Sequence, residues 1–186
     1  EYREVQQKAA VLYRKQPRFQ LITTGKISQK TLLFENQHLE RLQKASRYFT
    51  FPFDEDSLRE EIEKECQSCD LQQDYRLRIS LSKSGEIGID RQVLTPLSPS
   101  FCQAKLCLQE ADLQQAFTYF KTTHRPHLTM GEQEIIYYTV DGKLLETSIG
   151  NLVLKMNSKL YTPPSILGIL PRSEERRVGK ECASMC

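Results

Sequence analysis

The sequence has no long hydrophobic run and no excess of charge of one sign, and each absence excludes a class of protein. No stretch of 18 or more residues is apolar, so no membrane-spanning helix is expected. The formal net charge is only +2, and no stripe of Lys and Arg alternates with aromatic residues. Because nucleic-acid binders gain affinity by neutralising phosphates, we do not expect a nucleic-acid partner.

The sequence also lacks the features of a secreted protein and of a metal centre. Its start, EYRE, has no hydrophobic signal region and no initiating Met, so we expect a cytoplasmic chain that is a fragment. The six cysteines include one C-x-x-C pair, Cys66 and Cys69, but no second pair with ligand spacing. His124 and His127 lack a third ligand. We therefore expect buried thiols and no metal site.

The residue patterns in the first half of the chain predict a sheet backed by helices. Hydrophobic spacing indicates three helices: one over residues 1–14, one from an N-cap at Asn36 to about Phe49, and one from Asp54 or Asp56 to about Cys66. Alternating residues and turn residues indicate strands at Phe19–Thr23 and Thr31–Phe34, joined by a turn at 25–30, and at Tyr75–Leu81 and Glu86–Asp90. Tyr75–Leu81 alternates apolar and polar residues most clearly, so one of its faces is expected in the core.

The second half predicts short strands. Residues 91–101 contain two prolines and no periodicity, so they read as a linker between two units. Strands are expected at Ala104–Leu108, Glu134–Val140, Leu144–Thr147, Leu152–Met156 and Leu160–Thr162, with Asp141-Gly142 as a hairpin turn. The predicted fold class is α+β, with a small first domain and a strand-rich second domain.

One lysine stands out chemically. Lys121 lies in an otherwise apolar and hydroxyl-bearing segment, and the carboxylate of Glu146 follows one hairpin later. A cofactor held as a Schiff base needs such a lysine and a carboxylate. The pattern therefore favours an enzyme.

Four motifs in a fixed order carry a resemblance to a known family. They are H-L-x-R-L at 38–42, K-T-T-x-R at 121–125, E-T-S-x-x-N at 146–151 and T-P-P-x-x-x-G-x-L-P at 162–171. In this order they resemble the fold-type IV pyridoxal-phosphate enzymes, which include 4-amino-4-deoxychorismate lyase and the branched-chain and D-amino-acid aminotransferases. K-T-T-x-R after an aromatic segment is more similar to the lyase. The resemblance covers residues 18–171 and implies a two-domain enzyme with pyridoxal 5'-phosphate between the domains.

The resemblance also implies a reaction and a domain organisation. The lyase eliminates pyruvate from 4-amino-4-deoxychorismate, a small molecule, and leaves 4-aminobenzoate for folate biosynthesis. Residues 1–15 resemble the end of the chorismate-binding component of aminodeoxychorismate synthase, so an upstream synthase domain is expected in the native chain. The expected domains are 1–15 from that synthase, 16–97 as the small domain, 98–171 as an incomplete cofactor domain, and 172–186 as a tail outside the family. Family members usually form homodimers.

Roles for single residues follow from the same resemblance. The resemblance implies that Lys121 is the catalytic residue and binds the cofactor, that Arg41 binds the cofactor phosphate and that Glu146 contacts the pyridine nitrogen. It also implies backbone contacts from Ile149 and Gly150 to the cofactor. Arg78 and Thr24 are the implied substrate contacts. Arg76, which we expect on the opposite face of its strand, is the alternative to Arg78. Thr23 is a second candidate hydroxyl donor, although strand threonines are more often structural.

The sequence departs from the family after Pro171. The family continues with a glycine and a phosphate-binding helix start, whereas here Arg172 and a charged run follow. This departure predicts a truncated second domain and leaves a non-catalytic remnant as one alternative. An amino-acid aminotransferase is the other alternative, and Pro126, where aminotransferases often carry a tyrosine, is evidence against it.

Overall fold

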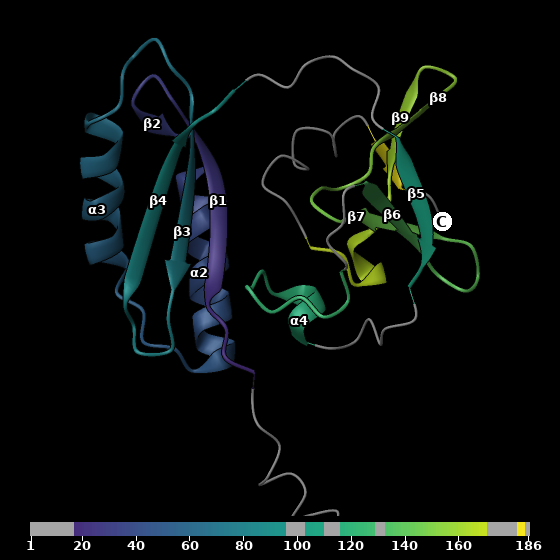
Figure 1. Ribbon diagram of the computed structural model, residues 1–186, viewed down its shortest axis with the longest axis horizontal. Coiled ribbons are helices and arrows are strands. Elements are labelled where there is room, and N and C mark those ends of the chain that lie inside the picture. Colours follow the sequence, from purple (N-terminus) through teal and green to yellow (C-terminus); the bar gives the residue numbers. More distant parts are fainter. Residues whose placement is uncertain (1–16, 96–102, 110–115, 129–132, 171–181, 185–186) are drawn as a thin grey trace, which may run out of the picture.

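The computed structural model describes residues 17–95, 103–109, 116–128, 133–170 and 182–184 (Figure 1). The helix expected over residues 1–14 lies outside the described residues. The described chain forms one helix-backed sheet and a second, strand-rich part, which confirms the α+β prediction. Among the described residues, no helix combines the length and the apolar character needed to cross a membrane.

The first sheet is antiparallel and has the strand order β2-β1-β3-β4. Its strands are β1 (Leu21–Ser28), β2 (Thr31–Leu32), β3 (Tyr75–Leu81) and β4 (Ile87–Val93), and its helices are α2 (Glu35–Phe49) and α3 (Glu55–Gln67). Every second residue of β3 is buried, because Leu77, Ile79 and Leu81 point toward the helices. They pack with Leu39, Leu42 and Ala45 of α2 and with Leu58 and Ile62 of α3. This is the expected core.

Several boundaries in this part differ from the predictions. β1 continues through Gly25 to Ser28, so the turn is only Gln29 and Lys30, both with left-handed φ angles of 48° and 59°. α2 begins after Phe34, also left-handed, and not at Asn36. β4 extends to Val93, into the expected linker. In contrast, α3 begins as expected: Asp54 accepts a hydrogen bond from the Ser57 backbone N–H at 3.1 Å.

The second part contains two small sheets. One has the order β5-β6-β7, from β5 (Ala104–Leu108), β6 (Glu134–Tyr138) and β7 (Leu144–Thr147). The other has the order β10-β9-β8, from β8 (Leu154–Met156), β9 (Lys159–Thr162) and β10 (Cys182–Ser184). A short helix, α4 (Ala116–Tyr119), and a 3-10 turn (Ser165–Leu167) complete it. A small core of Leu128, Tyr137, Leu145 and Ile169 holds this part together.

Candidate active site

The face of the first sheet that points away from its helices is polar. Thr24 of β1 lies directly opposite Arg78 of β3, and Lys26 lies opposite Arg76. The expectation that Arg76 points to the other face is wrong, because residues two apart on a strand share a face. Arg76 and Arg78 are therefore neighbours on this surface, which we call the polar sheet face.

The three cations of the polar sheet face differ in their partners. Lys26 forms an ion pair with Asp74, with Nζ and Oδ2 2.5 Å apart, and Arg76 donates a hydrogen bond to Gln92 at 2.8 Å. The Arg78 side chain makes no hydrogen bond or ion pair within the described part of the chain, and it is exposed. Its guanidinium is thus the one of the three that is available to an anion.

Lys121 joins this face through its backbone. The Lys121 carbonyl accepts a hydrogen bond from the Ile22 N–H at 2.9 Å, and Thr122 pairs with Leu21 at the free edge of β1. In this antiparallel pairing Lys121 stands opposite Ile22, so its side chain is placed on the same face as Ile22 and Thr24. Lys121 is half-buried. The fold therefore brings Lys121, Thr24 and Arg78, three residues predicted from distant motifs, to one face.

Thr23 has a structural position. Its side chain faces the helices, where its hydroxyl lies 2.8 Å from Nδ1 of buried His38 on α2. The first motif, H-L-x-R-L, thus contributes His38 to the attachment of α2 to the sheet. Arg41, one turn later on α2, is half-buried.

Glu146 lies in the second part of the chain, on β7, and only 3% of its surface is exposed. It lines a small cavity of about 10 Å³ together with His127 and Tyr137. Burial, together with the nearby charges of Arg125 and His124, lowers the pKa of His127 to about 4. His127 is therefore neutral near pH 7, in a site that sequence reasoning considered only for metal binding.

The turn after Glu146 donates hydrogen bonds to the carboxylate of Glu134, a residue of β6. Ser148 Oγ donates to Glu134 Oε1 at 2.8 Å and the Ile149 N–H donates to the same oxygen at 3.3 Å, while the Gly150 N–H donates to Thr147 Oγ1. Burial alone would raise the pKa of Glu134, but hydrogen bonds from the Thr147 and Ser148 side chains and from backbone N–H groups of the turn lower it. Sequence reasoning missed Glu134, because only the pairing of β6 with β7 brings it to this turn.

Comparisons with known proteins agree with this fold. Residues 20–185 match the family described as amino-transferase class IV. A solved protein of Mesorhizobium loti, provisionally named an amino-acid aminotransferase, has a TM-score of 0.76 and 22% identity, over 90% of this chain and 86% of its own. One from Haemophilus somnus, provisionally named a 4-amino-4-deoxychorismate lyase, has a TM-score of 0.68 and 18% identity, over 92% and 89%.

A third structure carries a cofactor. It is the PLP-bound form of a hypothetical aminotransferase from Mycobacterium tuberculosis, with a TM-score of 0.69 and 18% identity, over 89% of this chain and 71% of its own. No curated protein sequence matches the chain. At these identities the structural likenesses establish the fold, as the four motifs predict, and leave the choice between lyase and aminotransferase open.

Proposed function

Because the chain belongs to the class IV aminotransferase family, whose cofactor is pyridoxal phosphate, we propose that it is an aminodeoxychorismate lyase domain. The reaction breaks the C–H bond at the amino-bearing ring carbon of 4-amino-4-deoxychorismate and the C–O bond to its enolpyruvyl group. The ring becomes aromatic 4-aminobenzoate, and the enol is protonated to give pyruvate. The observation that carries the proposal is the shared placement of Lys121, Thr24 and Arg78 on the polar sheet face.

The chemical types of the candidate residues suit the binding of pyridoxal phosphate. Lys121 offers an amine for the aldehyde carbon, and Arg41 offers a planar guanidinium for the phosphate. Glu146 is a buried carboxylate, which would favour the protonated form of the pyridine nitrogen. Ile149 and Gly150 fit less directly. Their amides donate to Glu134 and Thr147 and would have to exchange these partners to reach a phosphate.

Each residue then has a defined task. Bound pyridoxal phosphate would supply an electron sink for the pair released when the C–H bond breaks. Lys121 accepts that proton at its Nζ from the amino-bearing ring carbon. Arg78 binds a substrate carboxylate through its two N–H groups, and the Thr24 hydroxyl donates a hydrogen bond beside it. Glu146 keeps the proton on the cofactor ring nitrogen.

Borohydride trapping tests the role of Lys121. The full chain is incubated with pyridoxal phosphate and reduced, and its peptides are mapped by mass spectrometry. We expect one stable adduct, on Lys121, which is absent from Lys121→Ala and retained in Lys105→Ala, a control at an exposed lysine of β5. Adducts scattered over several lysines would contradict the assignment.

The matched pair Arg78→Gln and Arg76→Gln tests substrate binding. The two residues share a face and a strand, but within the described part of the chain only the Arg76 side chain has a hydrogen-bond partner. In an assay for 4-aminobenzoate and pyruvate, we expect Arg78→Gln to raise KM roughly tenfold or more and Arg76→Gln to leave it nearly unchanged. Keto-acid-dependent amino transfer without 4-aminobenzoate would show an aminotransferase. No turnover together with no adduct on Lys121 would favour the non-catalytic remnant.

The wider organisation stays a prediction. This applies to the synthase segment at residues 1–15, to the domain limits, to the homodimer and to a tail from residue 172. The family match continues through residue 185, beyond the last motif, and β10 pairs with β9. Sequencing the 3′ end of the gene would test whether residues 172–186 are native.

A further inference from the structure

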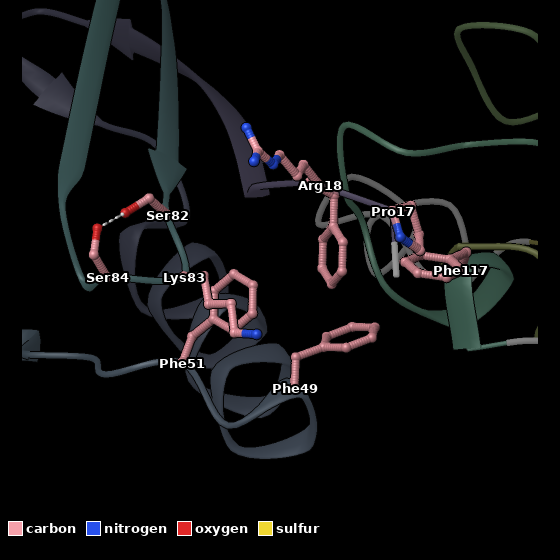
Figure 2. A pocket seen from close by; sticks show the side chains of 9 residues that line it. Pro17, Arg18, Phe49, Phe51, Ser82, Lys83, Ser84 and Phe117 are labelled. Atoms are coloured by element: carbon pink, nitrogen blue, oxygen red, sulfur yellow. Dashed lines mark hydrogen bonds between the residues drawn. The ribbon is translucent and has the colours of Figure 1, made fainter. Parts of the chain in front are cut away.

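Described residues also line an open cavity of about 950 Å³ (Figure 2). It lies where the start of β1, the end of α2, the turn between β3 and β4, and α4 meet. None of the residues predicted to bind cofactor or substrate lines it. Its size is at the upper end of the range of small-molecule sites, about 300 to 1,000 Å³.

The walls of this aromatic cavity are phenylalanine rings. Phe19 packs edge-on against Phe49 and Phe117, with ring centroids 4.9 and 5.1 Å apart, and stacks on Phe51 at 5.4 Å. Three of the rings come from the first part of the chain, and Phe117 comes from α4. These ring contacts hold the walls in place, so a flat apolar ligand would meet a largely preformed surface.

The charged groups of the aromatic cavity have one sign. Arg18 and Lys83 line it, and neither side chain makes an ion pair or hydrogen bond within the described part of the chain. Among the described residues that line the cavity, none is acidic. Figure 2 shows the Lys83 side chain running from the β3–β4 turn toward Phe51 and Phe49. The hydroxyls of Ser82 and Ser84, also in the lining, bond to each other at 2.7 Å. The Arg18 guanidinium points away from the rings in Figure 2, so the cation beside them is that of Lys83. A cation beside apolar rings is complementary to an anion with an aromatic body.

We propose that the aromatic cavity is a binding site for a flat aromatic carboxylate, whose rings pack among Phe19, Phe49 and Phe117 and whose carboxylate meets Lys83. The proposal does not depend on the reaction at Lys121. A ligand in this site touches both parts of the chain, because Phe117 belongs to α4 and the other walls to the first part.

Calorimetric titration of the full chain with 2-naphthoate tests the site. We expect saturable binding with one ligand per chain, and weaker binding of the neutral analogue 2-naphthamide. Lys83→Gln should weaken 2-naphthoate binding roughly two- to fivefold, as exposed ion contacts do. Lys64→Gln, an exposed lysine on α3, is the control that should leave the affinity unchanged.

Two further variants separate this site from the polar sheet face. Phe117→Ala removes one wall and should weaken 2-naphthoate and 2-naphthamide alike, because both use the rings. Arg78→Gln should leave 2-naphthoate binding unchanged. No binding by the unaltered chain, equal affinity for the acid and the amide, or a loss of binding in Arg78→Gln but not in Lys83→Gln would each overturn the proposal.

Discussion

At the scale of single residues, the contact between Gly25 and His38 determines how closely α2 lies on the first sheet. A Cβ at Gly25 would lie 2.6 Å from His38 Nε2 and 2.7 Å from Leu32 Cδ1. We expect Gly25→Ala to lower the free energy of unfolding by about 1 to 3 kcal/mol, measured by urea denaturation, because the buried ring must move. Since His38 causes part of the clash, Gly25→Ala combined with His38→Ala should cost less than the sum of the two changes. An unchanged urea midpoint in Gly25→Ala would contradict this packing.

His127 makes stability depend on pH. Burial, with Arg125 and His124 nearby, lowers its pKa from 6.5 to about 4. Between these values the unfolded imidazole binds a proton and the folded one does not, so stability falls as pH falls from about 6.5 to 4. The loss approaches about 3 kcal/mol at pH 4 and below. We expect His127→Gln to lose less stability than the unaltered chain between pH 7 and pH 4.5 in urea denaturation. Parallel pH profiles would contradict a buried neutral His127.

At the scale of elements, the end of α2 is strained. Thr50 closes the helix with a left-handed φ of 59°, and its N–H donates to the Ser46 carbonyl. A β-branched residue is unfavourable there and glycine is not, and the side chain is exposed. We expect Thr50→Gly to raise the free energy of unfolding by about 0.5 to 1 kcal/mol, after the greater freedom of glycine in the unfolded chain is subtracted.

The matched control for this helix end is Thr50→Ala, which removes the same side chain but keeps the left-handed strain. Its urea midpoint should lie at or below that of the unaltered chain. If Thr50→Ala and Thr50→Gly were equally stabilising, the gain would come from the lost side chain and not from the backbone.

At the scale of the whole molecule, two kinds of contact hold the two parts together. One is the backbone pairing of residues 121–123 with β1, in which the Ile22 N–H donates to Lys121 and the Thr123 N–H donates to Gln20. The other is the aromatic cluster, in which Phe117 of α4 lies against Phe19 and Phe49. The backbone pairing places Lys121 on the polar sheet face. Because the aromatic cluster anchors the segment just before Lys121, it stabilises the position of Lys121 without contacting the candidate active site.

Hydrogen exchange measures this coupling. We expect Phe117→Ala to speed exchange at the amides of Ile22 and Thr123, because the segment around Lys121 loses an anchor. Exchange at Ile79, whose strand pairs within the first sheet, should stay the same. Tyr119→Ala, an exposed position on the same short helix, is the control. Faster exchange at Ile79 as well would show global destabilisation instead.

The first part of the fold follows closely from the sequence. The alternation in Tyr75–Leu81, the apolar spacing of Leu39, Leu42 and Ala45, and the capping aspartate Asp54 are local patterns, and the structure confirms each of them. The misplaced boundaries at Gln29 and Phe34 lie where residues other than glycine adopt left-handed φ angles. Local sequence patterns do not predict such positions, because contacts with the surrounding structure hold the backbone in these conformations.

The sequence by itself determined the α+β class, the family motifs and the identity of the candidate residues, since these depend on residue type and short-range spacing. Only the tertiary structure decided which residues share a surface. Lys121 and Thr24 are far apart in the chain, and the pairing of Thr122 with Leu21 brings them together. It also showed that, among the described residues, the Arg78 side chain has no partner while that of Arg76 has one, and it assembled the aromatic cavity from four separate segments. Long-range strand pairing and side-chain packing create these relations, and no local pattern encodes them.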